Sequence, residues 1–138
     1  MIAQYLWETG SAIIGLMGLS HLRVTLGTDK LSPRDEKLIG EMKNTSLLFS
    51  DKLMLWKSWI GFNATHSSGA VFIGIANFYL ALCCFTFLRS SQFLLLLTIL
   101  AMGFYVWVAW KYWLKVVMIM LSVAWACFIL SYIMILMM

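Results

Sequence analysis

Two histidines and an asparagine are the residues of this chain best equipped to do chemistry. His21 lies at the end of one apolar run, and Asn63 and His66 lie at the start of the next. Asn63 and His66 are three residues apart, which places both side chains on one face of a helix. Imidazoles change charge near neutral pH, and an amide both donates and accepts hydrogen bonds. With Arg23 and Ser67, these residues predict a polar binding site for an anionic or carbonyl-bearing amphiphile.

Other chemistries for the same residues remain open. In membrane helix bundles, two histidines can hold a b-type haem as its axial ligands, and His21 and His66 could act in this way. A metal site is not expected, because a catalytic zinc takes three protein ligands and the nearest intramembrane acid, Glu8, lies about 20 Å along the same helix. No set of nucleophile, base and acid is evident. We therefore assign no catalytic residue and leave the cofactor unknown, with haem b as the alternative.

The composition of the chain excludes most classes of soluble protein. Of its 138 residues, 62% are hydrophobic and 12% are charged, and the mean hydropathy is +0.89. Soluble domains carry roughly 25% charged residues, about twice as many. The net charge of +4 comes from cations gathered mainly in one loop between apolar runs, a pattern typical of membrane topology. We predict an integral membrane protein whose partners are lipids, with no nucleic acid.

Four apolar runs are long enough to cross the hydrocarbon core, which requires about 20 helical residues. They cover residues 3–22, 61–88, 91–110 and 116–137. The predicted fold class is all-α, an integral membrane four-helix bundle made of two antiparallel hairpins. We expect a single membrane domain over residues 1–138.

The distribution of cations predicts the orientation of these runs. Nine of the ten lysines and arginines lie in the loop after the first run or near the turn at residues 111–115, and Arg89 alone lies on the other side. Positively charged loops stay in the cytoplasm. We therefore expect both termini on the non-cytoplasmic side of the membrane. The first run lacks a basic leading region, which favours an uncleaved anchor, and Trp7 is expected at the outer interface.

The loop over residues 24–58 predicts an amphipathic helical segment on the cytoplasmic surface. Ser32 and Pro33, followed by Asp35 and Glu36, are typical of a helix start, so a helix is expected from residue 33 to about 43. Residues 45 and 46 are expected to cap a second helix that includes Phe49 and continues into the second run. Such a segment either lies on the membrane surface or docks a partner.

Small and polar residues follow one face of each of the first two runs. Such stripes allow membrane helices to approach closely. An antiparallel pairing with His21 level with His66 brings Gly15 near Gly74 and Ser11 near Asn77. Tight helix packing alone would explain these polar groups, and this interpretation stays open beside ligand binding. The predicted packing residues are Ser11, Gly15, Gly18, Ala70, Gly74 and Asn77.

Two short elements of the sequence resemble a known pattern. The first is Gly-Leu-Ser-His-Leu at residues 18–22, and the second is Trp-Ile-Gly-Phe-Asn-Ala-Thr-His-Ser at residues 59–67. Together they resemble an uncharacterised family of small bacterial four-helix membrane proteins. The resemblance covers about the first half of the chain. It implies the four-span architecture and draws attention to His21, Asn63 and His66, but it implies no reaction.

The small size and the abundance of apolar surface favour a non-catalytic function. We expect an accessory subunit that packs against a larger membrane complex or forms a homo-oligomer, with a lipid, quinone or similar amphiphile in the polar site. The alternative is a small membrane enzyme or haem-binding redox carrier that uses His21 and His66.

Overall fold

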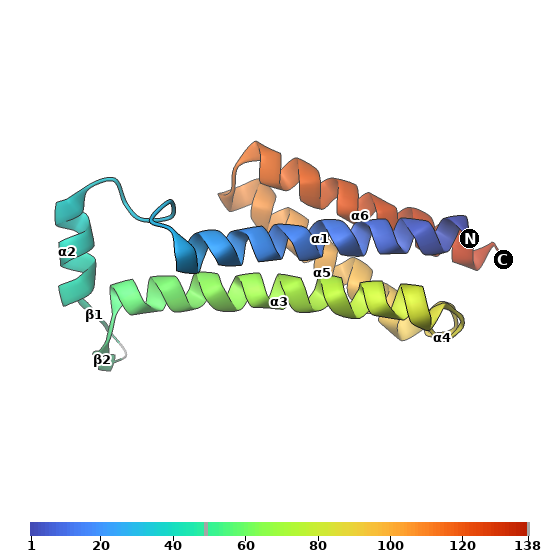
Figure 1. The fold of residues 1–138 in the computed structure, drawn as a ribbon, viewed down its shortest axis with the longest axis horizontal. Coiled ribbons are helices and arrows are strands. Elements are labelled where there is room, and N and C mark those ends of the chain that lie inside the picture. The colour runs from blue at the N-terminus through green and yellow to red at the C-terminus, as the bar shows by residue number, and fades with distance from the viewer. Residues whose placement is uncertain (49, 138) are drawn as a thin grey trace. The chain divides into compact units, whose positions relative to one another are not determined.

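A computed structural model describes residues 1–48 and 50–137, of which 83% are helical (Figure 1). This part of the chain forms six helices and one two-stranded ribbon. The helices are α1 (Ile2–Gly27), α2 (Glu36–Asn44), α3 (Leu55–Cys83), α4 (Phe85–Ser90), α5 (Gln92–Tyr112) and α6 (Lys115–Leu136). The strands are β1 (Ser46–Leu47) and β2 (Ser50–Met54). The predicted all-α class is confirmed.

Three of the described helices, α3, α5 and α6, are long and apolar enough to cross a membrane. Helix α1 is also long enough, with 26 residues. Its composition is less apolar, because Gln4, Glu8 and His21 interrupt the run. The chain therefore has the helices of a membrane protein, and the fourth span stays a prediction.

The second predicted span is interrupted near its end. Helix α3 ends at Cys83, and the short helix α4 begins at Phe85. Between them Cys84 has backbone angles φ −134° and ψ 34°, which lie outside the helical region. Residues 84–88 are thus not part of the long helix, contrary to the predicted run over residues 61–88. Helix α5 starts afresh after Ser91, whose side chain accepts a hydrogen bond from the Leu94 backbone N–H.

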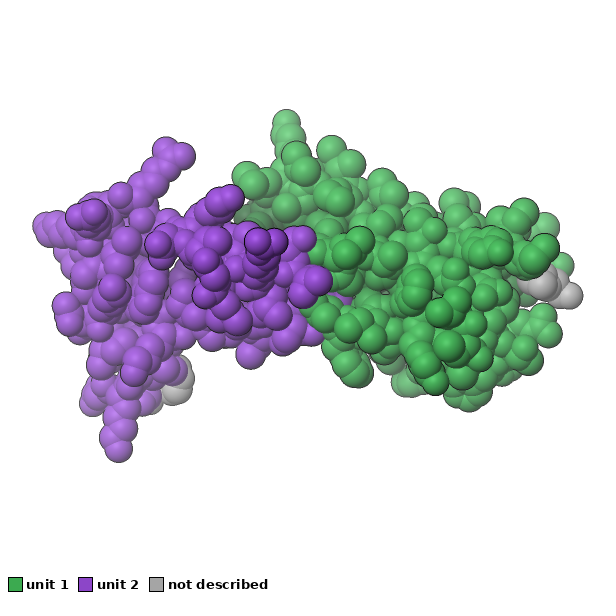
Figure 2. Space-filling view, in the orientation of Figure 1, with its two compact units in different colours: residues 1–17, 71–138 green, residues 18–70 purple. Residues whose placement is uncertain are grey.

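The chain divides into two compact units (Figure 2). The first unit comprises Met1–Met17 and Val71–Met138, and the second comprises Gly18–Ala70. Helices α1 and α3 each contribute residues to both units. Each unit is described separately, and the expected single domain stays a prediction.

A polar node joins three helices of the first unit. The indole Nε1 of Trp7 on α1 donates a hydrogen bond to Asn77 Oδ1 on α3, at 3.1 Å. The Thr98 hydroxyl on α5 donates to the same oxygen, at 3.0 Å. Trp7 is fully buried, so the expectation that it lies at the outer interface is wrong. Its place in the core follows from helical spacing, because Ala3, Trp7 and Ile14 fall on one buried face of α1.

Helices α1 and α6 run antiparallel within the first unit. The Trp7 and Phe128 rings meet edge to face, with centroids 4.8 Å apart. Near the start of α1, the Ser131 hydroxyl donates to the Ala3 backbone carbonyl at 2.6 Å. About two turns further along α1, Gly10 faces the Ala124 carbonyl, and a Cβ there would lie 2.9 Å from that oxygen. A glycine at this position is therefore required for the close approach of the two helices.

Helices α5 and α6 lie side by side and antiparallel (Figure 1). The indole of Trp125 donates to the Ile99 backbone carbonyl at 2.9 Å, and Tyr132 Oη donates to Gln92 Oε1 at 2.9 Å. Gly103 leaves room for the Trp125 ring, which would lie 3.3 Å from a Cβ at that position. In an apolar setting these hydrogen bonds fix the register that apolar contacts alone leave free.

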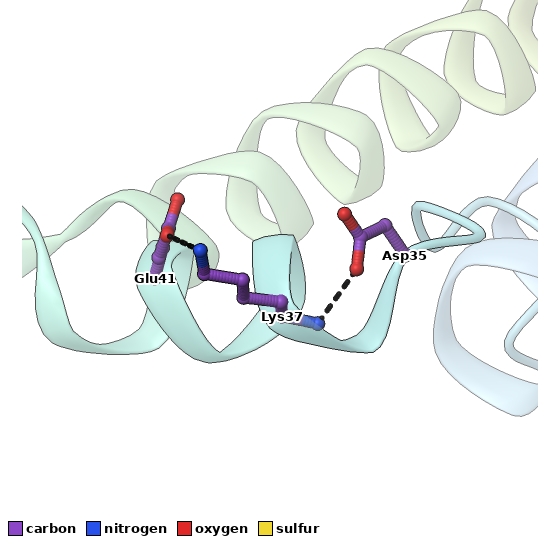
Figure 3. A network of polar contacts seen from close by, with 3 residues as sticks. All are labelled: Asp35, Lys37 and Glu41. Atoms are coloured by element: carbon purple, nitrogen blue, oxygen red, sulfur yellow. Dashed lines mark hydrogen bonds and ion pairs between the residues drawn. The ribbon is translucent and has the colours of Figure 1, made fainter.

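Helix α2 in the second unit lies where the sequence predicts a helix, but its N-cap is Asp35 and not the expected Ser32. The Asp35 carboxylate accepts a hydrogen bond from the Lys37 backbone N–H at 2.9 Å (Figure 3). Lys37 and Glu41, one turn apart, form an exposed ion pair at 3.9 Å. This short amphipathic helix is the predicted helical segment, although it starts at Glu36 and not at residue 33.

The expected second helix after Asn44 is wrong. Residues 46–47 and 50–54 form the two strands of an antiparallel ribbon, in which Ser46 pairs with Met54 and Leu47 with Ser50. Phe49 lies outside the described residues. The reason is local: the apolar and polar residues form separate blocks with no helical period, and the Ser50 and Asp51 side chains compete for backbone hydrogen bonds. Helix α3 begins only at Leu55, whose N–H donates to the Thr45 carbonyl.

Candidate functional site

The second unit brings three predicted site residues together. His21 lies near the end of α1, and Asn63 and His66 lie one helical turn apart near the start of α3. His21 Nε2 is 3.3 Å from Asn63 Oδ1. The His21 and His66 rings are perpendicular, at 89°, with centroids 6.1 Å apart. We call these three residues the polar trio.

The Asn63 amide is oriented by its own helix. Its Nδ2 donates a hydrogen bond to the Trp59 backbone carbonyl at 2.8 Å. This leaves Oδ1 as the atom that faces His21. Because an amide oxygen only accepts, His21 Nε2 carries the proton in this contact. The local helical bond thus fixes the chemical roles of both side chains.

Ser67 supports the polar trio without extending it. Its side chain is fully buried, and its hydroxyl donates to the Asn63 backbone carbonyl one turn earlier. Such back-bonding is usual for serine inside an apolar helix, where no water satisfies the hydroxyl. Ser67 is therefore placed to pack, and its proton is already used.

Arg23 is not brought to the polar trio by helix geometry. It is exposed, and it follows His21 by two residues on α1. Side chains two residues apart on a helix do not face each other. Arg23 is therefore attached on a different side of α1 from the face that His21 shares with Asn63.

The predicted packing residues fall in both units. In the first, Gly15 and Gly74 are in backbone contact. Asn77 receives Trp7 and not Ser11, whose hydroxyl donates to the Trp7 carbonyl on its own helix. In the second unit, Gly18 and Ala70 are both buried. The residue of α1 that contacts Asn77 is thus Trp7, one helical turn before the expected Ser11.

No protein-family model, curated protein or solved structure matches this chain.

A cavity of about 310 Å³ in the second unit was not anticipated from the sequence. Thr25 lies one turn beyond His21 on α1, and Ile60 lies one turn before Asn63 on α3, so the same two helix faces continue from the polar trio. The i+4 spacing of Thr25 from His21 is the signal that points to it. The lining residues are Thr25, Leu26, Gly27, Thr28, Asp29, Ser32, Trp56 and Ile60.

The polar trio is suited to hydrogen bonding. His66 is exposed and His21 is partly exposed, so both imidazoles are within reach of a bound group. Within residues 1–48 and 50–137, no group of three His, Cys, Asp or Glu side chains is arranged to hold a metal ion. Two imidazoles and one oriented amide offer donors and acceptors to a carbonyl, hydroxyl or phosphate oxygen.

Proposed function

We propose that this chain is a small, non-catalytic integral membrane protein that holds the polar end of an amphiphile at the polar trio. The contact of His21 Nε2 with Asn63 Oδ1, beside the perpendicular His66 ring, carries the proposal. Polar side chains are expensive in apolar helices, and those found there usually face a partner or a bound group.

The exposure of the trio supports ligand binding over helix packing alone. A packing role would bury both imidazoles, as Ser67 is buried on the same helix. His66 instead is exposed. A lipid headgroup or a quinone carbonyl at this position would gain hydrogen bonds. In a fully hydrated position, water would compete for the same bonds.

For the architecture, we propose a four-helix membrane bundle of two hairpins, with α1 as the fourth span. Both termini would lie on the non-cytoplasmic side of a bacterial inner membrane, because the cations gather in the loop after α1 and near the α5–α6 turn. Membership of the uncharacterised bacterial four-helix family belongs to this proposal and is supported only by the two motifs at residues 18–22 and 59–67.

For its assembly, we propose an accessory subunit or homo-oligomer in the membrane. Large apolar side chains are exposed on both α5 and α6, among them Phe93, Leu100 and Val116 at 67–72%. In water such a surface would aggregate, whereas in a bilayer it contacts lipid tails or neighbouring helices. Few of the described residues lie outside α1, α3, α5 and α6 to support independent chemistry.

The haem alternative is less well supported by the geometry. Because His21 Nε2 is directed to Asn63 Oδ1, only His21 Nδ1 is left to bind an iron as axial ligand. The enzyme alternative requires a nucleophile or acid beside the histidines, and Ser67 is buried with its proton donated to a backbone carbonyl.

Native mass spectrometry of protein gently extracted from its own membranes, with an absorption spectrum of the same sample, tests the proposal. Wild type should carry lipid or quinone, and His66→Ala should lose roughly tenfold of it. Ser68→Ala is the matched control, since Ser68 is exposed two residues away and its hydroxyl bonds the Thr65 carbonyl. Equal retention in all three proteins would overturn the amphiphile site, and a haem band lost in His66→Ala would favour the redox alternative.

A further inference from the structure

The cavity at the end of α1 has the size of a headgroup rather than of a whole lipid. Its volume of about 310 Å³ lies at the lower end of the range for small-molecule pockets. Leu26 and Ile60 supply apolar wall, while threonine and serine hydroxyls supply polar wall. Trp56 lies directly before the apolar part of α3, where tryptophan prefers the headgroup level of a bilayer.

The polar wall of the cavity offers mainly acceptors. The hydroxyls of Thr25 and Thr28 donate their protons to the His21 and Val24 carbonyls, which leaves their oxygens as acceptors. The Thr28 oxygen already accepts one hydrogen bond, from the Lys30 backbone N–H at 3.3 Å. Asp29 is the one charged residue of the lining. Among residues 1–48 and 50–137, its carboxylate has no ion pair or hydrogen bond. An acceptor-rich wall with one unpaired carboxylate favours a ligand that carries a cation.

The Trp56 ring, which forms part of the cavity wall, is in contact with a cation. The Lys43 ammonium lies over it, 5.6 Å from the ring centroid, which shows that this indole accepts a cation. The same lysine brings a positive charge to the wall that Trp56 forms. The cavity is thus lined by a carboxylate, Asp29, while the Lys43 ammonium lies outside the lining, over the Trp56 ring.

We propose that this cavity binds a zwitterionic headgroup in which a phosphate and an ammonium are joined by a short linker, as in phosphoethanolamine. The ammonium lies by Asp29 and the threonine hydroxyls, and the phosphate lies by Lys43. The inference rests on the proposed function, because it supplies the headgroup class of the amphiphile held beside the polar trio. Thr25 connects the two, since its hydroxyl bonds the His21 carbonyl.

Lipid retention from a mixed bilayer tests this assignment. The full chain is placed in nanodiscs of equal phosphatidylethanolamine and phosphatidylglycerol, released into detergent, and its bound lipids are counted by native mass spectrometry. Wild type should retain phosphatidylethanolamine over phosphatidylglycerol by about threefold to tenfold, and Asp29→Asn should bring that ratio near one. Asp29→Glu should restore the preference, and circular dichroism checks that each variant is folded.

Two further variants provide the matched comparison. Glu36→Gln removes an exposed acid of α2 that does not line the cavity, and it should keep the wild-type ratio. Lys43→Gln should weaken retention of both lipids, because both carry the phosphate. A wild-type ratio of one, an unchanged ratio in Asp29→Asn, or an equal loss in Glu36→Gln would each overturn the proposal.

The same experiment separates this proposal from the one on which it rests. His66→Ala should lower total lipid retention and leave the ratio intact. If His66→Ala changes nothing while Asp29→Asn abolishes the preference, the polar trio fails and the cavity assignment stands. Free phosphoethanolamine in the wash identifies the source: displacement of the lipid shows that the headgroup suffices, and retention with an intact ratio shows that the acyl chains are also held.

Discussion

The contact of Gly15 with Gly74 is asymmetric, and this asymmetry gives a sharp test at the scale of single residues. A Cβ on Gly74 would lie 2.6 Å from the Gly15 nitrogen and 2.9 Å from the Ser11 carbonyl, both backbone atoms that cannot move aside. A Cβ on Gly15 would lie 3.5 Å from the Gly74 Cα, an ordinary contact. Gly74→Ala should therefore cost about 1–3 kcal/mol of stability, while Gly15→Ala should be neutral or slightly stabilising.

Thermal denaturation in detergent, followed by tryptophan fluorescence, measures this difference. Gly61→Ala is the control, because nothing lies within 4 Å of a Cβ at that position. Equal effects of Gly15→Ala and Gly74→Ala on the melting temperature would contradict the described approach of α1 to α3.

Asn77 is the second residue whose replacement should be costly. Its Oδ1 accepts from Trp7 Nε1 and from the Thr98 hydroxyl, and both donors lie in the core of the first unit. Asn77→Leu leaves two buried donors without an acceptor and should cost about 1–3 kcal/mol. Thr98→Val removes one donor and spares the other bond, so its cost should be about 1 kcal/mol or less. Unfolding in sodium dodecyl sulfate compares the stabilities of the two variants. An equal loss of stability would show that the Trp7 and Thr98 donors do not share the Asn77 oxygen.

At the scale of elements, α2 depends on its cap more than on its ion pair. Asp35→Ala removes the acceptor for the Lys37 N–H and should destabilise the helix by about 1 kcal/mol. Glu41→Gln breaks an ion pair whose side chains are 84% and 60% exposed, and should cost at most about 0.5 kcal/mol. Amide hydrogen exchange over residues 36–44 measures both effects. Faster exchange in Glu41→Gln than in Asp35→Ala would reverse this ranking.

Local signals placed some elements well and misplaced others. Ser32 and Pro33 predict a helix here, but its start is placed three residues too early, because Asp35 is also a capping residue and its carboxylate accepts the Lys37 N–H. The ribbon over residues 46–54 was expected to be helical, since the apolar residues around Leu47 and Met54 look amphipathic when read at helical spacing. Strand pairing joins residues that are apart in the sequence, so a short stretch of sequence does not reveal it. The ribbon forms here because neither strand has a continuous helical period.

At the scale of the whole molecule, the position of α1 decides the topology. If α1 spans the membrane, residue 2 and residue 48 lie on opposite sides, and residue 48 is cytoplasmic. Ile2→Cys and Leu48→Cys, both at exposed positions, report this in a background where Cys83, Cys84 and Cys127 are replaced by serine. A membrane-impermeant maleimide should label Ile2→Cys in intact cells and Leu48→Cys only after permeabilisation.

The contrary outcomes of this labelling are distinct. Equal labelling at both positions would place α1 on the membrane surface and leave three spans. Labelling of Leu48→Cys alone in intact cells would show that the protein has the opposite orientation. Ser90→Cys, at the last residue of α4, is the control, because it should behave like Ile2→Cys in the four-span topology.

The sequence by itself determined the membrane class, the approximate limits of α5 and α6, the existence of a short helix before residue 44 and the helix faces that carry His21, Asn63 and His66. These features depend on composition, on run length and on helical periodicity, which are all local quantities. Only the tertiary structure decided that Trp7 is in the core with Asn77 and that His21 contacts Asn63. The physical reason is that the rotation and axial position of one helix against another are set by packing, and packing at a single glycine such as Gly74 depends on which backbone atoms it meets.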